Sequence, residues 1–268
     1  MFKPLIVIPA RIGSTRFPRK PLAEIAGISM LRRTARTASR VADTDYIVAT
    51  DSDNIMAHCQ EYDIPAVLTA SDIASGSDRV LTAADAIQSD ADILVNLQGD
   101  APFTEVEHVT AVIAALRTGD ADIATPYIKL DWAALDGLRE AKRLTPFSGT
   151  TLIENDGQAI WFSKNIIPAI RREEELRVTS PLSPICRHIG LYAYRRESLR
   201  RYAALPVSHF EALEGLEQLR ALENGMRIAA VEVAKARISS PGIDTPEDLA
   251  RAEQLLEEFG DDFERDSQ

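Results

Sequence analysis

The sequence has few cysteines and no long hydrophobic run. Its two cysteines, Cys59 and Cys186, lie far apart and form neither a disulfide framework nor a metal motif. No apolar run approaches the roughly 20 residues that cross a bilayer, so a transmembrane helix is not expected. The short apolar run at residues 4–10 reads directly as a strand, so we expect no signal peptide and a reducing, cytoplasmic setting.

Positive charge is also scarce. The 268 residues include 30 basic and 41 acidic side chains, a net charge of -11. Nonspecific nucleic-acid binding needs a positive surface, so we expect no nucleic-acid partner and no membrane partner. Against this background the stretch "IPARIGSTRFPRKPL" at residues 8–22 is unusual, because it gathers four cations, namely Arg11, Arg16, Arg19 and Lys20.

Common nucleotide-binding signatures are missing from the sequence. It contains neither the GxxxxGK[ST] phosphate loop nor the GxGxxG fingerprint. The 8–22 stretch nevertheless has small residues and cations directly after an apolar strand. Backbone N–H groups can approach phosphates there while arginine and lysine neutralise their charge. This pattern favours a triphosphate site, and a solvated basic loop is the alternative.

Apolar strand-like runs alternate with amphipathic helical stretches in the first half of the chain. Strands are predicted at 4–10, 45–51, 65–70 and 92–100, and helices at 30–42, 54–62, 79–87 and 105–116. This alternation predicts an α/β fold, a mostly parallel sheet flanked by helices on both faces. The ligand site is then expected beyond the carboxyl ends of the strands.

The second half is less regular and predicts a smaller mixed α+β part. We expect a hairpin over 150–164, a strand over 185–196, a helix over 209–225, a strand over 227–233 and a helix over 244–259 capped by Thr245. Residues 1–130 are predicted to bind the nucleotide. Residues 131–258 are predicted to bind the second substrate and pack on the same sheet, and 259–268 to be a disordered tail.

Two aspartates are candidate metal ligands. Asp100 follows a buried strand in "VNLQGDAP", and Asp244 precedes a helix in "GIDTPED". Hard oxygen ligands suit Mg²⁺, which takes one or two carboxylates plus phosphate oxygens. Each aspartate could instead be no more than a helix-capping acid.

Seven motifs in series resemble one family over nearly the whole chain. They are "IPARIGSTRFPRKPL", "ASGSDRV", "VNLQGDAP", "WFSK", "RHIGLYAYR", "LEGLEQLRALENG" and "GIDTPEDLARAE". Together they resemble the 3-deoxy-manno-octulosonate cytidylyltransferases, the CMP-KDO synthetases. The resemblance implies a Rossmann-like nucleotidyltransferase fold, a homodimer, and activation of 3-deoxy-D-manno-octulosonate (KDO) with CTP for lipopolysaccharide biosynthesis.

The resemblance also implies a role for each matching residue. Cytosine and the triphosphate would be held by Pro9, Ala10, Arg11, Arg16 and Lys20, with Ser75 and Gly76 lining the base pocket and Arg79 facing the incoming acid. Mg²⁺ would be bound by Asp100 and Asp244, which with Arg11 and Lys20 form the catalytic set. The sugar acid would be bound by Gln98, Lys164, His188, Tyr192, Glu217 and Gln218.

Each assignment has a plainer alternative. His188 could be an internally bonded histidine, Tyr192 a packing residue and Glu217 an exposed charge. Three departures from the family pattern leave the acid open. Ala101 replaces the usual glutamate, Lys164 replaces the usual arginine, and the segment 144–153 differs. The rivals are a cytidylyltransferase for another acid, such as 8-amino-KDO or a small phosphonate, and a non-catalytic nucleotide-binding protein.

Overall fold

The chain folds into two compact units. The structure, a computed structural model, describes residues 2–13, 17–73, 75–238, 242–243, 245–261 and 263. The first unit comprises residues 1–113 and 235–268, and the second comprises residues 114–234. The compact units therefore divide after residues 113 and 234, whereas the boundary predicted from function lies near residue 130. The binding roles given to those parts stay predictions.

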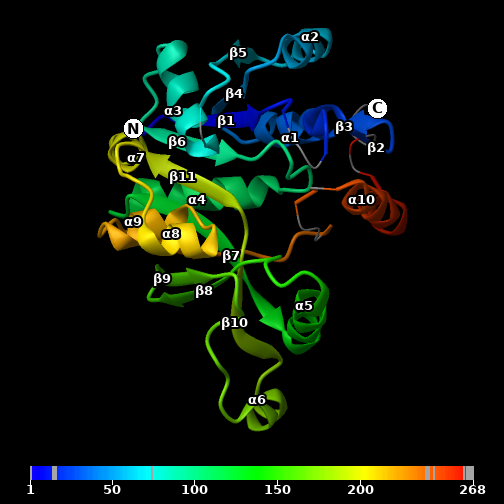
Figure 1. Ribbon diagram of the computed structural model, residues 1–268, viewed down its shortest axis with the longest axis vertical. Coiled ribbons are helices and arrows are strands. Elements are labelled where there is room, and N and C mark those ends of the chain that lie inside the picture. Colours follow the sequence, from blue (N-terminus) through cyan, green and yellow to red (C-terminus); the bar gives the residue numbers. More distant parts are fainter. Residues whose placement is uncertain are drawn as a thin grey trace. The chain divides into compact units, whose positions relative to one another are not determined.

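The first unit is built around a parallel sheet with the strand order β6-β1-β4-β5. Its strands are β1 (Pro4–Ala10), β4 (Asp45–Thr50), β5 (Ala66–Leu68) and β6 (Ile93–Leu97), with a small hairpin of β2 (Glu24–Ile25) and β3 (Ile28–Ser29). Its helices are η1 (Lys20–Leu22), α1 (Met30–Ser39), α2 (Asp53–Glu61), α3 (Gly76–Ala86) and α10 (Pro246–Phe259), and α4 (Val106–Thr118) leads into the second unit. Helices α1 and α3 both pack on β1 (Figure 1).

The hydrophobic pattern explains this sheet. Every residue of β6 is buried, as is nearly every residue of β1, which is typical of strands covered on both faces. The register places the ends of β1 and β4 side by side, with Ala10 opposite Thr50. The expected mostly parallel sheet flanked by helices is confirmed here.

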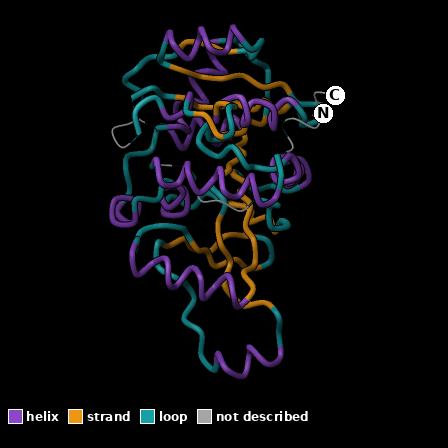
Figure 2. The backbone as a smooth tube through the Cα atoms, turned by 90° about the vertical axis from the view of Figure 1, so that its right-hand side faces the viewer, coloured by secondary structure: helices purple, strands orange, loops and turns teal. Residues whose placement is uncertain are grey.

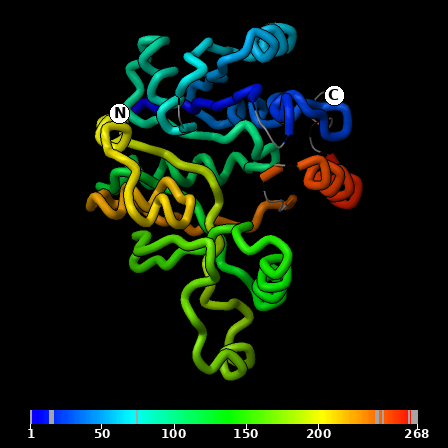
Figure 3. The backbone as a smooth tube through the Cα atoms, in the orientation of Figure 1, coloured from blue at the N-terminus to red at the C-terminus, as the bar shows by residue number. Residues whose placement is uncertain are grey.

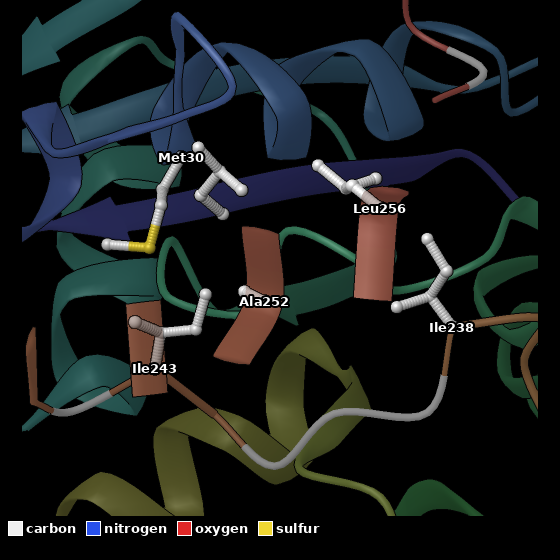
Figure 4. Close-up of a cluster of buried hydrophobic side chains, with 6 residues drawn as sticks. Met30, Ile238, Ile243, Ala252 and Leu256 are labelled. Carbon is white, nitrogen blue, oxygen red and sulfur yellow. The ribbon is translucent and has the colours of Figure 1, made fainter. Parts of the chain in front are cut away.

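The C-terminal helix returns to the start of the chain. Figure 3 shows the red C-terminal segment beside the blue N-terminal one. In α10, Ala252 and Leu256 pack in a buried cluster with Met30, Ile238 and Ile243 (Figure 4). The helix begins with the predicted capping box, in which the Thr245 hydroxyl accepts a hydrogen bond from the Asp248 N–H. Burial of the cluster ties this helix to α1 and the β2–β3 hairpin.

The second unit contains a closed ring of strands. Its strands are β7 (Ile123–Asp131), β8 (Thr151–Asn155), β9 (Gln158–Ser163), β10 (Leu182–His188), β11 (Leu191–Arg195) and β12 (Ile228–Glu232). Strands β7, β10, β8, β9 and β12 pair in that order, and β12 pairs back to β7, while β11 pairs with the first residues of β7. The hairpin predicted over 150–164 is confirmed as β8 and β9. Closure leaves these strands few unpaired edges.

Helices complete the second unit. They are α5 (Trp132–Leu144), α6 (Glu173–Thr179), α7 (Arg196–Ala203), α8 (His209–Glu214) and α9 (Gln218–Glu223). Helix α6 sits at the tip of the long connection between β9 and β10, at the bottom of Figure 2. Two sequence predictions were wrong. The expected single helix over 209–225 is broken at Gly215, whose φ of 64° ends α8 in the left-handed region. The expected strand over 185–196 is two strands, because the chain turns at residues 189–190.

Among the described residues, no helix is long and apolar enough to cross a membrane.

Candidate functional site

Two parallel strands of the first unit end in close contact at the predicted ligand edge. A Cβ added to Gly99, which follows β6, would lie 2.9 Å from the carbonyl oxygen of Pro9 in β1. Real Cβ atoms essentially never come so close to backbone, so only glycine fits there. The "PAR" turn, ending in Arg11, and the "QGD" turn are therefore held directly against each other.

Lys20 and Asp100 form an ion pair across this edge. The Lys20 Nζ donates to Asp100 Oδ2 at 2.6 Å, although the two residues are 80 positions apart. The lysine side chain is 13% exposed and the aspartate 32%. Partial burial leaves this pair less screened than a surface pair. The predicted cation and the predicted carboxylate therefore meet at one place.

The Asp100 carboxylate also fits a magnesium ion. The described residues contain no group of three or more histidine, cysteine, aspartate or glutamate side chains able to hold a metal. Mg²⁺ bound to a nucleotide needs only one or two carboxylates, because phosphate oxygens and waters complete its octahedron. The Oδ2 atom of Asp100 already accepts a hydrogen bond from the Lys20 ammonium, so this carboxylate stabilises positive charge at the edge of the sheet. The other predicted ligand, Asp244, and the predicted phosphate ligand Arg16 lie outside the described residues.

The predicted base-pocket residues begin helix α3. Ser75 is the N-cap, and its hydroxyl accepts a hydrogen bond from the Asp78 N–H. A Cβ on Gly76 would lie 3.3 Å from Gln98 Nε2 and 3.4 Å from Asn96 Nδ2. The amide of Gln98 donates to Asn96 Oδ1 at 2.9 Å. Gln98 is thus positioned against the start of α3, and Asn96, which the sequence analysis did not single out, orients it.

Arg79 is buried inside the first unit. Its side chain is 0% exposed and its guanidinium points inward, and its predicted role in facing the incoming acid stays a prediction. Its Nη2 lies 3.5 Å from Asp51 Oδ2, and its Nη1 donates to Thr69 and to the carbonyl of Ala70. These internal partners hold the guanidinium within the fold, although its buried Nε has no hydrogen-bond partner among the described residues.

His188 is a neutral hydrogen-bonding group of the second unit. Burial, with a contribution from the positive charge of Lys164, lowers the pKa of His188 to about 3. Its Nε2 lies 2.8 Å from the Thr125 hydroxyl, which itself donates to the Leu191 carbonyl at 2.7 Å. The hydroxyl proton is committed to that carbonyl, so Nε2 carries the ring proton and Nδ1 remains an acceptor. Thr125 was missed because its partners come from other strands.

Two aromatic rings, those of Tyr192 and Phe162, lie against the imidazole of His188. The ring of Tyr192 lies 5.4 Å from that of His188, and the ring of Phe162 lies 5.2 Å away on an edge-to-face contact. Burial raises the pKa of Tyr192 well above its usual value, with help from Tyr194 and Glu217, so the phenol stays protonated. This cluster offers neutral donors and acceptors beside the positive charge of Lys164.

Helices α8 and α9 bring their own predicted residues to the same unit. The carbonyl of Glu217 accepts a hydrogen bond from the Tyr202 hydroxyl at 3.1 Å. Gln218 is 5% exposed, and its buried Nε2 has no hydrogen-bond partner among the described residues. Glu214, which the sequence analysis missed, accepts from the backbone N–H of Lys164 at 2.8 Å and from Ser163 at 2.8 Å. Because the chain breaks at Gly215, Glu214 at the end of α8 binds the Lys164 backbone, while Gln218 at the start of α9 keeps an unpartnered amide.

The segment 144–153, which departs from the family pattern, is fixed by a lysine. Lys142 donates through Nζ to the carbonyls of Pro146, Ser148, Gly149 and Lys164. Burial and the charge of Lys164 lower the pKa of Lys142. The altered segment is therefore a defined turn whose anchor also touches the backbone of Lys164.

A cavity of about 490 Å³ in the first unit lies away from this chemistry. Its walls come from α1, the segment after the "QGD" turn and the C-terminal segment, and include Arg33, Arg36, Phe103, Asp261 and Phe263. None of the predicted site residues that the structure describes lines it. Several of its cations are internal partners, since Arg33 forms an ion pair with Asp261 at 2.6 Å. Size alone does not make it the reaction site.

Known proteins resemble this chain along nearly its full length. A family profile described as cytidylyltransferase matches residues 5–228. The 3-deoxy-manno-octulosonate cytidylyltransferase of Maricaulis maris is 42% identical over 260 residues, which cover 96% of this chain and 98% of that protein. The enzyme of the same name from Acidobacterium capsulatum is 41% identical over 253 residues, covering 93% and 95%. A solved structure of CMP:2-keto-3-deoxy-manno-octonic acid synthetase complexed with CTP superposes with a TM-score of 0.82 at 33% identity, covering 96% and 99%.

Proposed function

Because the chain belongs to the cytidylyltransferase family, among the 3-deoxy-manno-octulosonate cytidylyltransferases, we propose that it activates KDO with CTP, giving CMP-KDO and pyrophosphate. The observation that carries this proposal is the Lys20–Asp100 pair at the carboxyl ends of β1 and β6. A cation and a carboxylate at one sheet edge suit a reaction that brings a metal-bound triphosphate to an acidic acceptor.

The chain's own residues in the first unit would hold the nucleotide. Lys20 and Arg11 offset the phosphate charge, and the close approach of Gly99 to Pro9 keeps the two turns in register. The start of α3 at Ser75 and Gly76 would line the cytosine pocket. No protein nucleophile is needed, because transfer of this kind depends on positioning and charge neutralisation.

Mg²⁺ is the proposed cofactor, held by Asp100 and by Asp244. When bound, it neutralises phosphate charge and lowers the pKa of the acceptor's hydroxyl. Without such a cation, Asp100 and the phosphates would repel each other, and Lys20 alone offsets only part of that repulsion.

The second unit would hold the sugar acid. The anomeric 2-hydroxyl of KDO attacks the α-phosphorus in line and pyrophosphate leaves. Lys164 would pair with the acid's carboxylate, the acceptor Nδ1 of His188 would accept from a sugar hydroxyl, and Tyr192 would donate. The unpartnered Nε2 of Gln218 supplies a further donor, together with Glu217 as acceptor. A site built to pair every hydroxyl rejects acids that lack one.

An acid panel tests this proposal. Purified protein is incubated with CTP and Mg²⁺ and with KDO, 8-amino-KDO, a sialic acid or a small phosphonate, and pyrophosphate release is followed. We expect the highest kcat/KM with KDO. Equal or better turnover of another acid would overturn the substrate assignment. Binding of CTP without pyrophosphate release from any acid would identify a non-catalytic nucleotide-binding protein.

A second candidate, the same reaction on a different acid, is favoured by one structural observation. Lys164, in place of the family's usual arginine, lacks the fork that binds a carboxylate through two parallel hydrogen bonds. Its carbonyl is also tied to Lys142, which anchors the altered segment 144–153. The Lys164→Arg variant separates the two readings, because improved use of KDO would mark the lysine as an adaptation to another acid.

We also propose that the protein is a cytoplasmic homodimer serving lipopolysaccharide biosynthesis. Phe210 and Leu213 of α8 are 43% and 67% exposed, whereas the nearby Leu216 and Leu219 are buried. The two exposed side chains are the apolar surface that a second copy would cover. Light scattering on the purified protein tests the dimer, and a mass of one chain would refute it.

A further inference from the structure

A fully buried arginine joins three elements at the nucleotide end of the first unit. Arg79 lies one turn into α3, and its side chain is 0% exposed. Its Nη1 donates to the Thr69 hydroxyl and, at 3.2 Å, to the Ala70 carbonyl, both just after β5. Its Nη2 faces Asp51, just after β4, at 3.5 Å. The guanidinium therefore links the loops after two parallel strands to the start of a helix.

The contact with Thr69 has a defined direction. The Thr69 hydroxyl donates to the Thr50 carbonyl at 3.0 Å, so its proton is used and its oxygen accepts from Arg79. Thr50 is the last residue of β4, opposite Ala10 at the end of β1. This chain of hydrogen bonds connects α3 to the strand beside the "PAR" turn.

The ion pair itself is incompletely satisfied. Arg79 Nε and Asp51 Oδ1 are buried, and neither has a hydrogen-bond partner among the described residues. Buried polar atoms are almost always paired in folded proteins, and an unpaired one costs stability. A long and half-satisfied buried pair is thus poor evidence for a purely stabilising role.

The position of the pair gives it another role. Three residues before Arg79, Gly76 begins α3 so close to the amides of Gln98 and Asn96 that an added Cβ would lie 3.3 Å and 3.4 Å from them. The same guanidinium lies within the electrostatic reach of Arg11. Burial lowers the pKa of Arg79, the Asp51 carboxylate opposes this, and the charge of Arg11 lowers it further. Asp51 therefore offsets one of two neighbouring guanidinium charges.

We propose that Asp51 and Arg79 are positioning residues for CTP: the pair anchors the Ser75–Gly76 end of α3 and balances the charge beside Arg11, without touching the sugar acid. This inference rests on the proposed function and deepens it. It predicts that loss of either partner weakens nucleotide binding and leaves the use of the acid unchanged.

The experiment compares Arg79→Lys and Asp51→Asn with the unaltered protein. The lysine keeps the charge and loses the fork, and the asparagine keeps the shape and loses the charge. CTP affinity is measured by calorimetry without acid, and KM for KDO is measured at saturating CTP. We expect the Kd for CTP to rise about tenfold in each variant, the cost of a misplaced pocket, with KM for KDO within about twofold. The double variant is expected to bind CTP no more weakly than the worse single variant, since both act through one contact.

Arg33→Lys is the matched control. Arg33 is 6% exposed and pairs with Asp261, so it is also buried and acid-paired, but none of its hydrogen bonds within the described part of the chain reaches a predicted nucleotide residue. The control is expected to lose stability and keep its CTP affinity. If Arg79→Lys does not fold, Asp51→Asn carries the test alone, because its side chain has the same shape.

Three outcomes would overturn the inference. A raised KM for KDO with unchanged CTP affinity would show that Arg79 serves the binding of the acid and not that of CTP. Loss of stability with unchanged CTP affinity, as in the Arg33→Lys control, would make the pair purely structural. Failure of the unaltered protein to bind CTP would refute both this inference and the proposed function. If the unaltered protein binds CTP but turns over no acid, only the proposed function is refuted, because the positioning role is tested by the CTP affinity of the variants.

Discussion

Replacing Gly99 with alanine should damage the reaction by separating two turns. The added Cβ would lie 2.9 Å from the Pro9 carbonyl oxygen, whereas ordinary contact begins near 3.4 Å. The strand ends must therefore part by about 0.5 Å, in a close-packed region that yields little. Since Asp100 is the next residue, its 2.6 Å contact with Lys20 moves as well.

The expected cost of Gly99→Ala has two components. Overpacking of this kind destabilises by about 1–3 kcal/mol, measured by urea unfolding. Misplacement of the reacting groups is expected to lower kcat/KM for CTP by about ten- to a hundredfold, measured as pyrophosphate release at a temperature where the variant is fully folded.

Gly137→Ala is the control for this variant. Gly137 lies within α5, and an added Cβ meets nothing within 4 Å, so alanine should stabilise that helix by about 0.5–1 kcal/mol and leave turnover unchanged. If Gly99→Ala folded and turned over CTP within about twofold of the unaltered protein, the close approach of the two turns would not set the geometry of the site.

Three further predictions concern single side chains. Asp100→Asn should lower the free energy of unfolding by about 1 kcal/mol, because a neutral amide does not replace the partly buried ion pair with Lys20. It should abolish pyrophosphate release, because the amide binds Mg²⁺ less well; near-normal turnover of the folded variant would reject the metal assignment. His188, with its pKa lowered to about 3, must stay neutral in the folded state, so the unfolded chain takes up the proton as the pH falls through about 6.5. The protein should therefore lose about 2 kcal/mol of stability between pH 8 and pH 5 from this group, and His188→Gln should remove that part of the slope. Gln218→Met should keep or slightly raise stability, since it removes an unpartnered buried amide, but should raise KM for the acid about tenfold; an unchanged KM would make the residue structural.

The strand pattern explains why two predicted nucleotide-site residues lie at one edge of the sheet, and their roles stay predictions. Parallel strands end at one edge, so Lys20 and Asp100 could be expected to meet although they are distant in the sequence. The predicted capping box at Thr245 rests on local chemistry and is confirmed. The exposure of Arg79 could not be predicted, because its burial depends on partners that follow two other strands.

The second unit was harder to predict for physical reasons. The leucine spacing across 209–225 continues through Gly215, so periodicity alone did not reveal the left-handed residue that ends α8. Likewise, Thr125 and Glu214 acquire their roles from hydrogen bonds to His188 and to the Lys164 backbone. Such contacts join residues that are distant in the sequence, so the spacing of residue types along the chain does not predict them.

The central claim is that this chain transfers the cytidylyl group of CTP to an acidic sugar with loss of pyrophosphate. Phosphorus NMR of a reaction with CTP, KDO and Mg²⁺ tests it most directly. The prediction is a new phosphodiester resonance whose amount equals that of the pyrophosphate formed. It appears with the unaltered protein and is absent with Asp100→Asn. Release of inorganic phosphate, or an unchanged CTP spectrum in the presence of KDO, would contradict it.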